Sequence, residues 1–157
     1  MVNFRVKVEG LENLGAASQR AQRAIVRQLN IGLLDVGHKV EKDAKDSIRG
    51  GSKSGRIYQR RTVTHRASAP GEAPANDTGR LLNGIRTKLD TIKLAVEVLA
   101  FARDKAGKVN YAYELEFGNS RVAARPFLFP ALERNKAWIR SRLEQALGRG
   151  IRDGAKR

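Results

Sequence analysis

Few residues of this chain have the types and spacing that catalysis or metal binding requires. The two histidines, His38 and His65, are not accompanied by further residues at the spacing of a metal site. Glu114 and Glu116 have the spacing of paired carboxylates on one strand face, which general acid–base catalysis can use. In so cationic a chain, exposed or ion-paired carboxylates are the favoured interpretation. No motif joins serine, histidine and aspartate as a nucleophilic triad. We therefore expect a chain that is not an enzyme and that binds no metal or cofactor.

The distribution of charge is a second candidate for function. The sequence holds 31 lysines and arginines against 16 acidic residues, a formal net charge of +15. Such an excess attracts nucleic acid, an anionic membrane or an acidic protein partner, although it also serves simply to keep a surface solvated. No acidic residue occurs between Asp46 and Glu72, and over 134–157 eight basic residues face only Glu144 and Asp153. The positive charge is concentrated in one loop and in the C-terminal region.

Length and composition predict one folded domain, 1–157. A chain of 157 residues with 41% hydrophobic and 30% charged residues can bury a substantial core. It contains no cysteine, which excludes disulfides and thiolate metal sites. The most apolar stretch, 94–102, is short and contains Glu97, so we expect no contact with a membrane.

The first third of the chain predicts a strand and then a long helix. Apolar and polar residues alternate over 2–8, the pattern of a strand with one buried face. Apolar residues then recur every three or four positions over 14–48, until a glycine pair begins at Gly50. An unbroken helix of this length spans about 50 Å, more than the roughly 40 Å width of a compact globule of this size. We expect an elongated subunit, a bend near Gly32 and Gly37, or an overhang that a neighbouring subunit covers.

Beyond this helix the chain changes character. Residues 51–79 predict an extended basic loop that is longer than an ordinary connection. The spacing of a phosphate-binding loop is absent, and the segment follows a helix rather than a strand, so we reject such a site. Asp77 or Thr78 is expected to cap a short helical turn.

The remainder predicts a sheet and a last helix. Strands are expected near 86–89 and 94–101, whereas 111–117 fits either a strand or a short helix. The last helix starts near Pro130 and ends at Gly148. The tail at 149–157 is then basic and flexible. The resulting fold class is α+β, with an antiparallel sheet and with the long N-terminal helix and the C-terminal helix packed on one face.

Two motifs stand out by their glycine and proline content. Glycine and proline fix the shape of a backbone, and aromatic residues give a surface rigid groups for contact. This combination indicates a subunit that contacts other proteins in an assembly. The first motif is SAPGEAPA at 68–75 with DTGRL at 77–81, and the second is YA at 111–112, EFG at 116–118 and ARPFL at 124–128.

In this order and spacing, and with PAL at 130–132, the motifs resemble the small neck or tail-completion proteins of long-tailed bacteriophages. This is the lambdoid head–tail joining family that includes minor-tail-protein-Z-like chains. The resemblance spans most of the chain, from the first helix to the last. Asn119 departs from the family, in which a threonine or serine often follows the Phe-Gly pair, and the departure concerns the turn at that point.

The resemblance implies a structural virion protein at the head–tail junction. It implies a homo-oligomeric ring of six or twelve copies that joins the capsid connector to the tail tube and lets DNA pass. The implied partners are other copies of the chain, head-connector or head-closure proteins, and the tail tube or tail terminator protein. Contact with phage DNA is expected to be transient and non-specific. Such a protein is made in the host bacterial cytoplasm and resides in the virion.

Roles for particular residues follow from this resemblance. Phe117 and Phe127 fit a contact surface and the domain core equally well. Arg125 is expected to pair with Glu116, within the fold or across a subunit boundary. The residues expected at the interface with other copies or partners are Tyr111, Tyr113, Glu116, Phe117, Arg125, Pro126 and Phe127. The residues expected to contact DNA in the lumen, or an acidic partner, are Arg56, Arg60, Arg61 and Arg66, with a solvated loop as the competing interpretation.

The main alternative is a stand-alone basic nucleic-acid-binding protein. The charge excess and the basic C-terminus favour it. Against it, no recognised nucleic-acid-binding motif occurs, and the aromatic residues are not interleaved with the basic clusters as a stacking platform requires.

Overall fold

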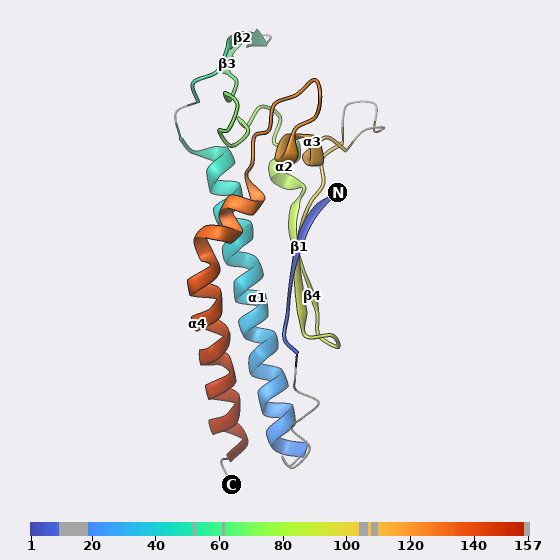
Figure 1. Ribbon diagram of the computed structural model, residues 1–157, viewed down its shortest axis with the longest axis vertical. Helices are drawn as coiled ribbons and strands as arrows, with labels where there is room; N and C mark the ends of the chain where they lie inside the picture. Colours follow the sequence, from blue (N-terminus) through green and yellow to red (C-terminus); the bar gives the residue numbers. More distant parts are fainter. Residues whose placement is uncertain (10–18, 52, 61, 104–106, 108–109, 156–157) are drawn as a thin grey trace.

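The computed structural model describes residues 1–9, 19–51, 53–60, 62–103, 107 and 110–155, with the side chain of Arg60 outside this description. The molecule is elongated, with two long helices side by side and a small sheet next to one of them (Figure 1). The elements in chain order are β1 (Val2–Lys7), α1 (Gln19–Arg49), β2 (Ile57–Arg60), β3 (Val63–Arg66), α2 (Arg80–Asn83), β4 (Ile85–Asp90), β5 (Ala95–Ala100), α3 (Ala112–Phe117) and α4 (Leu128–Ala155).

A three-stranded antiparallel sheet joins the N-terminus of the chain to its middle. β5 is the central strand, with β1 and β4 on either side. Ala100 of β5 lies between Val2 of β1 and Ile85 of β4, and all three side chains are buried. On the opposite face, Arg5 pairs with Glu97. The three strands expected from the sequence are confirmed, because period-two alternation reports directly which face of a strand is buried.

Helix α1 lies between the sheet and α4 (Figure 1), so it buries side chains toward both. Leu33 and Val36 belong to its apolar stripe and are fully buried. Gly37 lets the sheet approach closely, since a Cβ there would lie 2.4 Å from Cγ2 of Thr87. The Thr87 hydroxyl in turn donates a hydrogen bond of 2.7 Å to Glu41. The glycines of α1 therefore permit close packing, and the long helix is accommodated by an elongated subunit.

Helix α4 packs antiparallel along α1. A Cβ at Gly150 would lie 2.6 Å from Cα of Ile25, and a Cβ at Gly154 would lie 2.6 Å from Cα of Ala21, so the two backbones are nearly in contact. Both helices thus lie on the same face of the sheet, with α1 against the strands and α4 along α1. The expected α+β fold is confirmed.

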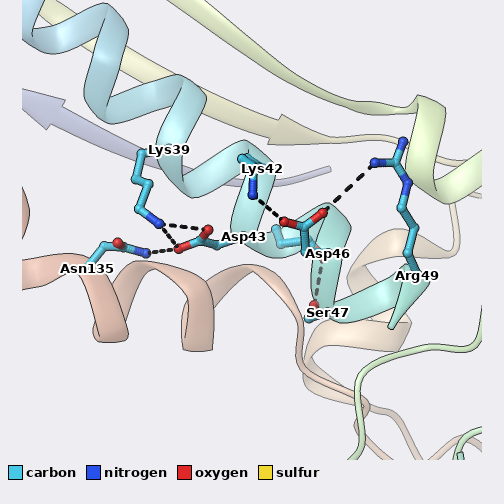
Figure 2. A network of polar contacts seen from close by, with 8 residues as sticks. Lys39, Lys42, Asp43, Asp46, Ser47, Arg49 and Asn135 are labelled. Atoms are coloured by element: carbon cyan, nitrogen blue, oxygen red, sulfur yellow. Dashed lines mark hydrogen bonds and ion pairs between the residues drawn. The ribbon is translucent and has the colours of Figure 1, made fainter. Parts of the chain in front are cut away.

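Polar contacts fix the register of the two helices (Figure 2). Asp43 of α1 accepts hydrogen bonds from Lys39 and from the buried Asn135 of α4, the latter at 2.7 Å. Burial opposes the ionisation of Asp43, but the hydrogen bonds from Asn135 and Lys39 outweigh it and lower its pKa. Further along the helices, Arg142 pairs with Asp35. Asn135 and Arg142 of α4 each have a carboxylate acceptor on α1, so a shift in register would leave polar groups unpaired.

The last helix is longer than the sequence predicts. It begins at Leu128 and runs to Ala155, passing through Gly148, which was expected to end it. Over its described part, the segment 149–157 is therefore helical and not a flexible tail; residues beyond Ala155 lie outside the described residues. Packing against α1 outweighs the low helix propensity of glycine.

The prediction of an extended loop at 51–79 changes, and the two alternatives for 111–117 are resolved. The region 51–79 contains a two-stranded antiparallel sheet, the β2–β3 hairpin, at one end of the molecule. The ambiguous segment 111–117 forms the short helix α3. Gly79 occupies the cap position of α2 and makes no side-chain capping bond, so the expected cap position at Asp77 or Thr78 is wrong. The Thr78 hydroxyl still accepts a hydrogen bond of 3.5 Å from the N–H of Arg80. Across the described residues, no helix has the length and apolar character needed to cross a membrane.

We expect Gly150→Ala to destabilise the protein by about 1–3 kcal/mol, because its Cβ would overlap the backbone of Ile25. The matched change Gly148→Ala places a Cβ whose nearest contact is Arg152, at 3.6 Å. It should stabilise the helix by about 0.5–1 kcal/mol. Urea unfolding followed by circular dichroism measures both variants. Equal effects of the two substitutions would contradict the close packing of α1 and α4.

Candidate assembly surface

The two glycine- and proline-containing motifs come together at one end of the molecule, next to the β2–β3 hairpin (Figure 1). Between them lies an open cleft of about 290 Å³, which we call the motif cleft. Its lining includes Ser68, Asp77 and Arg80 from the first motif, Tyr111 and Arg125 from the second, and Leu115 of α3. Segments that are far apart in the sequence thus form one structural unit.

Main-chain groups hold the two motifs together. The N–H of Gly71 donates to the carbonyl of Ala124 at 2.9 Å. The Nε of Arg125 donates to the carbonyl of Ser68 at 3.1 Å. Because these bonds involve backbone carbonyls, they fix the path of each motif and not only the position of a side chain.

Glycine is required where the motifs turn. Gly71 and Gly118 have φ values of 82° and 74°, in the region that favours glycine. A Cβ at Gly118 would also lie 2.8 Å from the backbone nitrogen of Ala124. The motifs therefore encode a backbone shape and a close approach of two chain segments.

Glu72 organises the first motif. Its carboxylate accepts hydrogen bonds from the hydroxyl and the N–H of Ser54 and from the N–H of Ala69. These bonds, led by that of the Ser54 hydroxyl, lower the pKa of Glu72 to about 2. Lys53, whose own pKa is lowered by burial, donates to the carbonyl of Ala73 at 2.9 Å. One carboxylate and one ammonium group thus bind the start of the basic loop to the first motif.

Glu116 caps the start of α4 from outside that helix. Its carboxylate accepts hydrogen bonds from the N–H groups of Phe127, Leu128 and Phe129, at 3.0, 3.0 and 2.9 Å. The next residue, Pro130, has no N–H to satisfy. A single carboxylate therefore pairs the donors that a helix N-terminus leaves free, and its charge is favourable there.

The predicted interface residues fall into a buried and an exposed group. Phe127 is fully buried in the core, and Glu116 is buried beneath the start of α4, which corrects the prediction that they form a contact surface. Within the subunit, Arg125 and Glu116 bond to backbone groups and not to each other, so the alternative of a pair inside the fold is wrong. Tyr113 and Phe117 are 52% and 50% exposed. The partly buried members are Tyr111, Arg125 and Pro126.

Tyr113 and Phe117 belong to an aromatic patch with Phe129. The ring centroids of Tyr113 and Phe117 lie 4.8 Å apart, and those of Phe117 and Phe129 lie 5.5 Å apart. The first two rings lie one turn apart on α3, and the third is on α4. Exposed rings held in contact with each other form a rigid apolar surface, which is typical of protein contact sites.

The β2–β3 hairpin presents basic and apolar side chains together. Arg56, which precedes β2, and Arg66, the last residue of β3, are both exposed. The predicted contact residue Arg60 lies in β2, and both its side chain and Arg61 fall outside the described residues. The exposed apolar residues of the hairpin are Ile57, Tyr58 and Val63.

The side chains around the motif cleft include several titratable groups. Tyr58 stacks on His65 with ring centroids 5.7 Å apart, and Nε2 of His65 lies 3.6 Å from Asp77. Burial raises the pKa of Tyr111, although the nearby Arg80 opposes that rise. Hydroxyl, carboxylate and guanidinium groups beside apolar walls are suited to holding a polypeptide segment by hydrogen bonds.

Within the residues that the structure describes, no group of three or more histidine, cysteine, aspartate or glutamate side chains is placed to hold a metal ion. No protein-family model, no curated protein and no solved structure was found to match this chain.

The sequence alone did not reveal what Glu72 and Glu116 do. For Glu116, the sequence did contain a sign that the start of the last helix needs a capping group. The last helix starts after Pro126 and Phe127, neither of which can cap a helix with its side chain. The free N–H groups at that end therefore needed an acceptor from another part of the chain.

We expect Glu116→Gln to destabilise the protein by about 2–3 kcal/mol, because an amide loses the charge and turns one acceptor oxygen into a donor facing backbone N–H groups. Glu114→Gln is the matched control on the same short helix, and it should change stability by less than about 0.5 kcal/mol. Thermal and urea unfolding measure both. A Glu116→Gln variant as stable as the control would exclude the capping role.

Glu72 should make stability depend on pH under acidic conditions. Its pKa in the folded protein is about 2, below the ordinary 4.5, so its stabilising effect is fully present above about pH 4.5 and is lost as the pH falls toward 2. Glu72→Gln cannot ionise, so it should unfold at lower urea concentration than wild type near neutral pH. That difference should shrink as the pH falls through this window. Glu133→Gln, which removes an exposed carboxylate elsewhere, is the control. A pH-independent difference for Glu72→Gln would contradict the assignment.

Proposed function

We propose that this chain is a structural virion protein of a tailed bacteriophage or prophage, which forms a ring at the head–tail junction, joins the capsid connector to the tail tube and lets DNA pass. The observation that carries the proposal is the convergence of the two motifs. The segments that resemble the neck and tail-completion family fold into one unit with a fixed backbone shape, beside the aromatic patch. A rigid surface with exposed rings suits protein–protein contact.

A ring of identical subunits requires two different surfaces that fit each other. The aromatic patch is the first candidate, and the apolar side of the β2–β3 hairpin is the second. Ile57 and Val63 of the hairpin are 53% and 54% exposed. Because these surfaces lie on different elements of the same end of the molecule, the patch of one copy can receive the hairpin of the next.

The remaining length of the subunit suits contact with neighbouring layers of the junction. Helix α1 has 31 residues and is about 46 Å long. Such a rod extends well beyond the motif end, toward a head-connector or head-closure protein on one side or the tail tube or tail terminator protein on the other. Arg56 and Arg66 remain candidates for contact with DNA or with an acidic partner.

We expect the double substitution Tyr113→Ala and Phe117→Ala to abolish ring formation while leaving the fold intact, because both side chains are half exposed. Phe127→Ala should instead cost about 3–5 kcal/mol of stability, since its ring is fully buried. Ile92→Ala, at a side chain that is 93% exposed in another part of the molecule, is the control and should assemble normally. Native mass spectrometry and thermal melts read assembly and stability separately. Normal rings from the double variant would remove the patch from the interface.

The proposal as a whole is tested by native mass spectrometry and negative-stain images of the purified protein, with and without tail tubes. A six- or twelve-fold ring, or a monomer that becomes a ring on a tail end, supports it. A monomer that ignores tail tubes but holds duplex DNA firmly at physiological salt would overturn it. That result favours the stand-alone basic nucleic-acid-binding protein.

A further inference from the structure

The end of the molecule opposite the motifs carries a group of exposed arginines. There the beginning of α1 and the end of α4 lie side by side (Figure 1). Within 19–28 and 145–155, the only acidic residue is Asp153. The arginines, which we call the arginine tip, are Arg20, Arg23 and Arg27 on α1 and Arg149 and Arg152 on α4.

Close helix packing brings these side chains together. Gly150 and Gly154 allow the backbones of α1 and α4 to approach closely at this end. The three α1 arginines line a hollow of about 390 Å³, with Asp153 of α4 at its side. Asp153 lies 3.6 Å from Arg27 and also accepts a hydrogen bond of 2.9 Å from Gln28. One shared carboxylate offsets only a part of the positive charge.

The positive charge of the arginine tip is less fully paired with carboxylates than the charge in the middle of the same helices. There, basic side chains are matched with carboxylates, which cancels much of their field. The pairs are Lys39–Asp43, Lys42–Asp46, Lys45–Glu41, Lys136–Glu133, Arg140–Glu144 and Arg142–Asp35. Along α1 and α4, the unpaired positive charge is therefore greatest at the end that carries the arginine tip.

We propose that the arginine tip binds the phosphate backbone of duplex DNA without reading its sequence. Guanidinium groups form paired hydrogen bonds with phosphate oxygens, which lysine cannot do. Arg20, Arg23 and Arg27 cover about 10 Å along the helix axis. Phosphates on one DNA strand advance about 3.4 Å each along the DNA axis, so a row of this length can reach about three of them. The rigid helices hold the row in place before DNA arrives.

The position of nearby apolar residues favours DNA over a membrane surface. Leu147 and Ile151 are 38% and 54% exposed near the arginine tip. At about 100° per residue, each lies about 160° around α4 from Arg149. A membrane-surface helix needs apolar groups that insert while the basic groups flank them. On α4, Arg149 thus points nearly opposite to both apolar side chains, and Arg152 lies about 100° from Ile151.

The arginine tip is distinct from the residues assigned to DNA above. The β2–β3 hairpin lies at the other end of the molecule, and its arginines stand among exposed apolar side chains that suit a protein partner. In the proposed ring, the arginine tip would face the lumen, and this placement rests on the proposed function. DNA binding by the arginine tip itself does not require a ring.

Fluorescence anisotropy with a labelled duplex of about 30 base pairs, at several salt concentrations, tests the proposal. Replacing Arg20, Arg23 and Arg27 by glutamine should weaken binding at least ten-fold at low salt. It should also reduce the slope of log affinity against log salt by about 2.7, or 0.9 for each lost phosphate contact. The matched control replaces Arg86 and Lys88 of β4 and Lys93 of the turn that follows it by glutamine. All three are exposed, and the change in charge is the same, so the slope should stay nearly unchanged.

A second variant keeps the test decisive if the first does not fold. Arg149→Gln with Arg152→Gln should reduce the slope by about 1.8, with an unchanged melting temperature because both side chains are exposed. Equal slopes for the tip variants and the Arg86, Lys88 and Lys93 control would overturn the proposal and leave only a general effect of net charge. Equally strong binding of polyglutamate or of anionic vesicles by the arginine tip would also overturn it.

The outcomes separate this proposal from the proposed function. A protein that stays monomeric on tail tubes but binds DNA through the arginine tip would refute the proposed ring and support DNA binding by the arginine tip. A protein that forms rings, while its tip variants bind DNA as wild type does, would refute DNA binding by the arginine tip and support the proposed ring.

Discussion

The rest of the structure depends on how closely α1 packs against two neighbours at once. At Gly37 it meets the sheet, and at Gly32 it meets α4, where a Cβ would lie 2.9 Å from that of Ala146. Any larger residue would push one neighbour away, and interiors packed this tightly tolerate little extra volume. The position of α4 follows from this contact, and with it the positions of both the motif end and the arginine tip.

At the motif end, two carboxylates pair main-chain donors beside the hydrophobic core. Glu72 accepts hydrogen bonds from the N–H groups of Ser54 and Ala69, and Glu116 accepts those at the start of α4. Irregular chain segments leave many main-chain donors unpaired, and each one that is buried without a partner is costly. The carboxylates solve this problem and leave the aromatic rings above them free for contact.

Much of the fold could be predicted from the sequence because local periodicity reports burial. The alternation over 2–8 and the helical spacing over 14–48 each describe one element in isolation, and both agree with the structure wherever it describes these residues. Features that depend on distant segments were missed. Gly148 is helical because its neighbours pack on α1, and Phe127 is buried because Glu116 holds the start of α4 over the core. The β2–β3 hairpin lacks the buried alternating face that makes a strand recognisable.

The order of pairing along the chain has a consequence for synthesis. β1 pairs with β5, which follows it only after α1, the hairpin and β4, and α1 finds its second partner in the last element. Contacts between such distant segments form late and slow the folding of a chain. While the ribosome is still making α4, the apolar stripe of α1 has no complete partner. The cap that shapes the second motif also acts on residues of α4. A nascent chain therefore cannot present a finished docking surface, and only the released, full-length subunit is competent to join others.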